Sequence, residues 1–165
     1  MQVILVSDTH GDRASLNWLR KTYPEADAFV HCGDLQIPSD EVQDFICVRG
    51  NTDYDPSYPW ERVEVFAGHR ILICHGHSYI SPFDPADPTA LVLAAKRRQC
   101  EAVFFGHTHV SCDITYQGIR LLNPGSLKRP KDFRFPYPTY MILNITEESI
   151  EAERAVYDPF AADKA

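Results

Sequence analysis

MQVILVSDTHG, residues 1–11, shows a pattern that recurs along this chain: an apolar run ends, and metal-binding side chains follow at once. Val3–Val6 is four consecutive aliphatic residues, which is typical of a buried strand, and Asp8 and His10 come directly after it. In α/β proteins, the loops at the carboxyl ends of strands meet at one edge of a sheet, where ligand sites form. The opening residues therefore predict a sheet with a polar site at that edge.

Four more segments repeat this arrangement. Their side chains are carboxylates, an amide and imidazoles, with no pair of cysteines, so the donors are oxygen and nitrogen atoms. The set is too large for one tetrahedral ion, whereas two metals that share a carboxylate would use all of it. Two metals about 3.5–4 Å apart are the usual means of hydrolysing phosphate esters. The segments are Gly33-Asp34, Gly50-Asn51-Thr52-Asp53, His75-Gly76-His77 and Gly106-His107-Thr108-His109.

The remaining chain is expected to alternate strands and helices before a β-rich final third. Asp12 is suited to cap a helix that runs to about Tyr23, before Pro24. Asp87-Pro88 predicts the start of a second long helix, which continues to about Gln99. A short helix is expected near Ser39–Asp44. The other expected strands are Ala28–His31, Phe45–Val48, Val63–Phe66, Ile71–Cys74, Val103–Phe105, Cys112–Tyr116, Ile119–Asn123, Thr139–Asn144 and Ser149–Tyr157, with a hairpin turn at Ala67-Gly68-His69.

The composition predicts one domain over residues 1–165 with a net charge of −7. This acidic balance argues against broad nucleic-acid binding. The five cysteines have no Cys-x-x-Cys spacing, so we expect reduced thiols, most of them buried. The apolar start is short and lacks a basic leader, and no apolar run approaches the roughly 20 residues that span a bilayer. We therefore expect a cytoplasmic protein without membrane contact.

These five segments, in this order, resemble the signature of the calcineurin-like metallophosphoesterases. The start Ser7-Asp8-Thr9-His10-Gly11, the run Asn123-Pro124-Gly125-Ser126 and the small size resemble the YfcE-type phosphodiesterases within that superfamily. The resemblance covers nearly the whole chain. It implies an α/β (α+β) fold, a four-layer αββα sandwich of two mixed β-sheets flanked by helices, with a dinuclear metal site at the carboxyl ends of the strands.

The resemblance also implies a role for each ligand. In the family pattern, one metal is held by Asp8, His10 and His109, and the second by Asn51, His75 and His107, while Asp34 bridges the two. The expected cofactors are two divalent ions, with Mn²⁺ foremost and Ni²⁺, Zn²⁺, Fe or Co²⁺ as alternatives. The implied activity is hydrolysis of a small phosphodiester by attack of a metal-bridging hydroxide.

The proton donor for the leaving group is the point at which this chain departs from the superfamily. Many members carry a histidine after the asparagine of the third segment, whereas this chain has Thr52, whose hydroxyl cannot donate a proton near neutral pH as an imidazolium does. His77 is one substitute, although it is equally suited to orienting a ligand imidazole. Our candidate catalytic residues are Asn51, Asp53 and His77.

Other residues have weaker claims on the site. His31 is expected to be structural or to support a ligand, and His69, in the predicted turn, to be exposed. Arg13 could meet a substrate phosphate, although a solvated helix-face arginine is as good an interpretation. Tyr54 and Tyr58 could wall a pocket or simply pack their loop. The basic residues Lys128, Arg129, Lys131 and Arg134 could approach the ligand, with a solvated loop as the default.

Two alternatives to the phosphodiesterase remain. The retromer complex contains a subunit of this fold that serves mainly as a scaffold, but its metal site is incomplete, whereas every ligand position is filled here. A protein phosphatase is disfavoured by Thr52 and by the short chain. Edge strands in the β-rich final third could also pair with a second copy, so a homo-oligomer is compatible with the sequence.

Overall fold

Two mixed five-stranded sheets form the centre of the protein in a computed structural model that describes residues 1–81, 83–158 and 160. Residues 161–165, the end of the single domain that we predicted over 1–165, lie outside the described residues. In spatial order, the first sheet consists of β10 (Ile150–Val156), β9 (Thr139–Ile145), β1 (Gln2–Val6), β2 (Ala28–His31) and β3 (Phe45–Cys47). The second consists of β4 (Glu61–Phe66), β5 (His69–Cys74), β6 (Ala102–Phe104), β8 (Ile119–Asn123) and β7 (Cys112–Tyr116).

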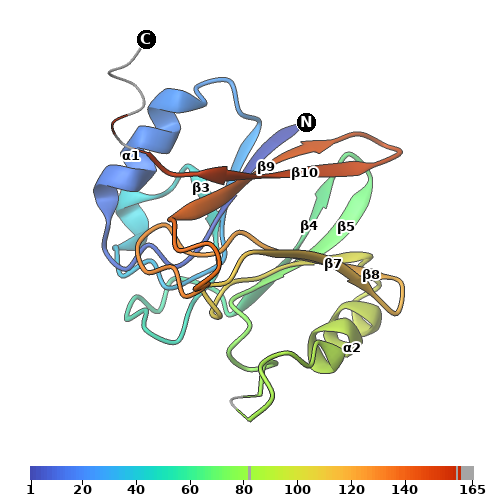
Figure 1. Cartoon of the computed structure of the whole chain (residues 1–165). Helices are drawn as coiled ribbons and strands as arrows, with labels where there is room; N and C mark the ends of the chain where they lie inside the picture. Colours follow the sequence, from blue (N-terminus) through green and yellow to red (C-terminus); the bar gives the residue numbers. More distant parts are fainter. Residues whose placement is uncertain (82, 159, 161–165) are drawn as a thin grey trace.

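The sheets pack face to face, and a helix covers the outer face of each (Figure 1). Strand β1 shows the layering: Val3 and Leu5 belong to the core between the sheets, while Ile4 and Val6 pack in the cluster that contains Leu16 of α1 (Arg13–Thr22). A strand buried on both faces must be apolar at every position, which explains the unbroken aliphatic run. On the other side, α2 (Thr89–Arg97) packs on the second sheet through Leu91, Val92 and Ala95. The predicted four-layer sandwich is confirmed.

The parallel strands determine where the site forms. Within the first sheet β1, β2 and β3 are parallel, and within the second β5, β6 and β8 are parallel. The loops that follow β1, β2 and β3 therefore leave one sheet at the same edge, and the loops that follow β5 and β6 leave the other sheet together. The two edges meet at the residues described in the next subsection.

The element boundaries differ from those predicted in ways that have local causes. The β4–β5 turn consists of Ala67 and Gly68, both with positive φ (47° and 94°), as a two-residue hairpin turn requires. His69 is therefore in β5 and not in the turn. The helix expected at Ser39–Asp44 is a short 3-10 helix, η1 (Ser39–Glu41). Helix α2 begins at Thr89, so Pro88 is the N-cap residue and not the first helical residue, and its side chain makes no capping hydrogen bond. Asp87, which we expected as the cap, lies one position earlier, and its carboxylate accepts the N–H of Thr89 at 2.9 Å.

Among residues 1–81, 83–158 and 160, no helix is both long and apolar enough to cross a membrane.

Candidate metal centre

All seven predicted ligands lie just beyond the carboxyl ends of parallel strands. The first sheet supplies Asp8 and His10 after β1, Asp34 after β2 and Asn51 after β3. The second sheet supplies His75 after β5, and His107 and His109 after β6. Residues up to 101 positions apart are thereby gathered between the two sheets.

Four of these side chains form one tight group. One ligand atom from each of Asp8, His10, Asp34 and His109 lies within 4.8 Å of the others. Nε2 of His109 is 3.0 Å from Oδ1 of Asp8 and 3.3 Å from Nε2 of His10. Nε2 of His10 is in turn 3.9 Å from Oδ2 of Asp34.

The hydrogen bonding of His109 fits a bound cation in this group. Its Nδ1 donates to the backbone carbonyl of Arg129 at 2.6 Å, so in the neutral ring Nε2 carries a lone pair. That lone pair points at Oδ1 of Asp8, a buried oxygen to which none of the described residues donates a hydrogen bond. A nitrogen lone pair facing a carboxylate oxygen is repulsive unless a cation or proton lies between them, and a carbonyl that fixes the tautomer is typical of metal-binding histidines.

The second group shares Asp34 with the first. Nε2 of His75 is 3.1 Å from Oδ1 of Asn51 and 3.5 Å from Oδ2 of Asp34, and its Nδ1 donates to the carbonyl of Cys32 at 2.7 Å. The imidazole rings of His75 and His107 are 5.2 Å apart. Oδ2 of Asp34 thus faces a histidine of each group. Asn51 is exposed, so the second group is open to solvent and to a substrate.

Charges in the centre are strongly coupled. Burial alone would raise the pKa of the Asp34 carboxyl, but the hydrogen bond and charge of His75 and the N–H of Thr52 outweigh it and lower this pKa. Burial likewise opposes charge on His75, but Asp34 and Asp8 raise its pKa. Without a bound cation, the two carboxylates therefore favour the protonated form of His75.

Five of the seven candidate ligands have left-handed backbone conformations. Non-glycine residues rarely adopt positive φ, and each such residue costs on the order of 1–3 kcal/mol, which packing elsewhere must offset. Strain of this kind gathers at functional sites, because the chain must turn sharply to direct a side chain back toward the end of its strand. The five residues are Asp8 (55°), His10 (46°), Asp34 (57°), His107 (69°) and His109 (58°).

Two glycines let the loops pack against the ligands. A Cβ on Gly50 would overlap the backbone and carboxylate of Asp34, and a Cβ on Gly106 would overlap Oγ of Ser7 and lie 2.7 Å from Oδ2 of Asp8. Oδ2 of Asp8 also accepts the Ser7 hydroxyl at 2.6 Å and the N–H of His107 at 3.1 Å. Any side chain at position 106 would therefore displace Asp8.

We expect Gly106→Ala to destabilise the fold by about 1–3 kcal/mol, the typical cost of overpacking, and to weaken metal binding. Gly118→Ala is the control: its Cβ would meet open space and, at φ 82°, only the left-handed conformation costs energy. Chemical denaturation and metal titration of both variants check this. A Gly106→Ala variant that binds metal like the wild type would contradict the expected overlap.

Asp53, one of the predicted catalytic residues, has both carboxylate oxygens occupied by backbone groups. Oδ2 accepts the N–H groups of Asp34 (2.9 Å) and Gly50 (2.7 Å), and Oδ1 accepts that of Gln36 (2.7 Å). The side chain therefore ties the loop after β2 to the loop after β3. This geometry favours a role in positioning Asp34. The short spacing from Asn51 to Asp53 indicated that Asp53 lies near the site, but it did not indicate that Asp53 holds the two loops together.

The residues considered as proton donors lie beside the second group. Thr52 donates its N–H to Oδ1 of Asp34 at 2.9 Å, while its hydroxyl is buried with no hydrogen-bond partner among the described residues. The centroid of the His77 ring is 5.5 Å from that of His75 and 6.2 Å from that of His107. It is 5.7 Å from the ring centroid of Trp60. Burial, together with the charge of His75, lowers the pKa of His77.

His31 has the surroundings of a residue that is structural or supports a ligand, the two roles expected for it. It is fully buried, Nδ1 accepts the N–H of Gly33 at 3.1 Å, and Nε2 lies 3.0 Å from the Thr9 hydroxyl. Burial lowers its pKa to about 3, so it stays neutral. The expectation that His69 is simply exposed was wrong: its side chain is 13% exposed and bonds Glu101 (2.7 Å) and the carbonyl of Thr146 (2.8 Å). His69 therefore joins β5 to the β9–β10 turn of the other sheet.

The remaining candidates divide between the surface and the site. Arg13 pairs with Glu41 on the surface, and Tyr54 is 87% exposed, whereas Tyr58 is buried and donates to the carbonyl of Ile37. The side chains of the basic segment are exposed, as the default of a solvated loop predicts, while its backbone reaches the centre. The carbonyl of Arg129 orients His109, and the backbone N–H of Lys131 donates to the carbonyl of His109 at 3.1 Å.

A buried cluster of carboxylates and histidines at the strand ends of an αββα sandwich is the arrangement expected of a metallophosphoesterase. The family model for the calcineurin-like phosphoesterase superfamily domain matches residues 1–148, so the chain belongs to that superfamily. It is 27% identical over 154 residues to the probable metallophosphoesterase YsnB of Bacillus subtilis, covering 90% of this chain and 87% of the relative.

Solved structures share the fold. A predicted phosphoesterase of Streptococcus pneumoniae superposes with a TM-score of 0.85 at 26% identity, covering 94% of this chain and 88% of the other. YfcE, a phosphoesterase of E. coli, has a TM-score of 0.66 at 19% identity, covering 96% of this chain and 100% of the other. Vps29 of Entamoeba histolytica in complex with Zn²⁺ has a TM-score of 0.72 at 21% identity, covering 96% of this chain and 100% of the other. The last two likenesses show the fold alone.

Proposed function

We propose that this protein is a metal-dependent phosphodiesterase that acts on a small phosphodiester. The observation that carries the proposal is the convergence of seven nitrogen and oxygen donors into two groups that share Oδ2 of Asp34. Asp8, His10 and His109 would hold one divalent cation, and Asn51, His75 and His107 the second. When bound, such a pair supplies an activated water and neutralises the charge of a phosphoryl group.

The protein groups around these ligands have separate tasks. The carbonyls of Arg129 and Cys32 hold His109 and His75 with Nε2 directed inward. Asp53 fixes the backbone of Asp34, so that Oδ2 faces both groups. The exposed Asn51 and half-buried His107 form the open side, where a phosphodiester would meet the centre. His77 is the imidazole in this region that remains outside both groups, and we assign it as the candidate proton donor.

The donor types bear on which cation is used. Imidazole nitrogen with carboxylate and amide oxygen suits Mn²⁺, Zn²⁺, Fe, Co²⁺ and Ni²⁺, and no thiolate is among the donors of either group. We propose Mn²⁺ as the working metal. All five cysteines are free, which fits a reducing compartment such as the cytoplasm.

We expect the metal-free protein to be nearly inactive toward an aryl phosphodiester and Mn²⁺ to restore turnover. The reason is that the carboxylates and imidazoles of the centre face one another and bind substrate phosphate only when cations lie between them. Chelation, elemental analysis and readdition of single metals check this, with a phosphomonoester assayed in parallel. Undiminished turnover at nil metal content would refute the proposed chemistry. Faster hydrolysis of the monoester would overturn the phosphodiester assignment alone.

The alternative is a scaffold, a role suggested by the shared fold with Vps29. The two groups of donors do not by themselves exclude it, because a scaffold can bind metal. The same assay separates the two roles: a scaffold would bind the cations, as elemental analysis would show, without hydrolysing any phosphate ester.

A further inference from the structure

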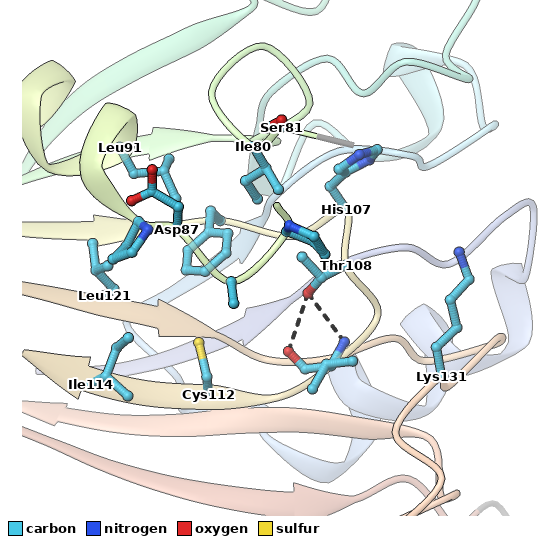
Figure 2. A pocket seen from close by; sticks show the side chains of 15 residues that line it. Ile80, Ser81, Asp87, Leu91, His107, Thr108, Cys112, Ile114, Leu121 and Lys131 are labelled. Carbon is cyan, nitrogen blue, oxygen red and sulfur yellow. Dashed lines mark hydrogen bonds between the residues drawn. The ribbon is translucent and has the colours of Figure 1, made fainter. Parts of the chain in front are cut away.

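An apolar pocket of about 550 Å³ opens beside the candidate metal centre. His107 lines it on one side, and Leu91, Ile114 and Leu121 lie on the side away from His107 (Figure 2). The pocket therefore begins at a ligand of the second metal and extends between α2, β7 and the segment before α2. Small-molecule sites in proteins commonly have volumes of roughly 300–1,000 Å³, so this pocket has room for an organic group larger than a phenyl ring.

The hydroxyl and carboxylate groups of this pocket are already engaged, and Lys131 contributes a cation to the lining. The hydroxyl of Thr108 contacts the backbone of Val110 at 3.3–3.4 Å and Nδ2 of Asn123 at 3.1 Å, and Figure 2 shows the bonds to Val110. The carboxylate of Asp87 accepts the N–H of Thr89 at the start of α2, and the Ser81 hydroxyl accepts the N–H of Phe83. A sugar or nucleoside placed here would lose water from several hydroxyl groups and find few partners to replace it, which is costly.

We propose that this pocket binds an apolar arm of the substrate, so that the preferred phosphodiesters carry an aryl or branched alkyl group. The inference rests on the proposed function. It follows from continuity: His107 belongs both to the second group of ligands and to the pocket wall, so a phosphoryl group at the centre places one ester arm at the pocket mouth. The arm then buries its apolar surface against Leu91, Ile114 and Leu121.

The test uses phosphonates, which carry a single organic arm and are not hydrolysed. Calorimetry on the Mn²⁺-loaded protein compares phenylphosphonate and cyclohexylphosphonate with methylphosphonate and 2,3-dihydroxypropylphosphonate. We expect the two apolar arms to bind about tenfold more tightly than methyl, as one well-buried hydrocarbon group can provide, and the dihydroxypropyl arm to bind no more tightly than methyl. Equal affinity for all four would overturn the proposal.

A matched pair of variants locates the effect. Ile114 is 47% exposed on the edge strand β7, and Val65 is 55% exposed on β4, the opposite edge of the same sheet. Ile114→Asn should bring the phenyl-to-methyl affinity ratio close to one and leave methylphosphonate binding unchanged, while Val65→Asn should keep the wild-type ratio. A ratio unaffected by Ile114→Asn would place the apolar arm elsewhere and overturn the proposal.

A second measurement does not depend on metal or turnover. In ¹H–¹⁵N spectra of the metal-free protein, an uncharged apolar probe, benzyl alcohol, should shift the amides of Val110 and Ile114 more than glycerol does. Selective binding of apolar phosphonates by a protein that hydrolyses no ester would leave the pocket assignment standing and the phosphodiesterase refuted. Hydrolysis of a phosphodiester without any apolar preference would support the phosphodiesterase and overturn the pocket assignment.

Discussion

Asp34→Asn is expected to lose at least one of the two metals and to lower kcat/KM by about 100-fold or more, since even residues that only support metal ligands are worth roughly 10–100-fold in affinity or activity. Oδ2 of Asp34 is 3.9 Å from Nε2 of His10 and 3.5 Å from Nε2 of His75, so a single atom serves both groups. An amide at this position keeps the shape but removes the negative charge. Elemental analysis and steady-state kinetics measure the two effects.

Ligands that serve one group are the comparison. His109→Ala should chiefly weaken the first metal and His107→Ala the second, while Asp113→Asn, whose carboxylate pairs with Arg120 on the surface, should change neither. Thermal unfolding curves establish that each variant is folded. Full occupancy and wild-type turnover in Asp34→Asn would show that Asp34 does not bridge.

The second large effect concerns the leaving group. Because Thr52 stands where many superfamily members carry a histidine, we expect hydrolysis to slow steeply as the leaving-group pKa rises. A general acid commonly contributes about 100- to 10,000-fold, so alkyl esters should fall behind aryl esters by at least the lower figure. Rates of a phosphodiester series with graded leaving groups measure the slope. A flat slope, with chemistry shown to limit the rate, would mean that an efficient acid is present.

Three variants identify the donor. Thr52→His should flatten the slope if the imidazole reaches the leaving oxygen. Thr52→Val is the control, because its side chain has the same shape without the hydroxyl, and it should preserve the wild-type slope. His77→Ala should steepen the slope. A slope unchanged by this substitution would show that His77 does not donate the proton.

The buried strands and the site edge could be predicted because both depend on patterns that are local in sequence. Val3–Val6 is apolar throughout because both its faces are buried, and the ligands follow because strand ends are where loops meet. The number of strands in each sheet and their order depend on long-range pairing, such as that of β1 with β9, which no local pattern records. The family resemblance implied two mixed sheets flanked by helices, but the number and order of the strands were not predicted.

Two features of the site had no local signal. The left-handed backbone of Asp8 and His109 could not be read locally, because Asp and His adopt positive φ more often than most residues but still rarely. Asp53 has the residue type of a catalytic carboxylate, and only the three N–H groups around it reveal that it holds two loops together. His69 was misjudged for a related reason, since its partner Thr146 lies 77 residues further on.

The division of the ligands between the two sheets has a thermodynamic consequence. Asp8 and Asp34 belong to one sheet and His75 and His109 to the other, so a cation bound to both would cross-link the layers as a disulfide does, but reversibly. The free energy of unfolding of the protein then depends on the metal concentration. By mass action, a site that the unfolded chain lacks adds about 2.7 kcal/mol when the free cation reaches 100 times its dissociation constant. Metal availability would therefore set the stability of the folded protein as well as its rate of hydrolysis.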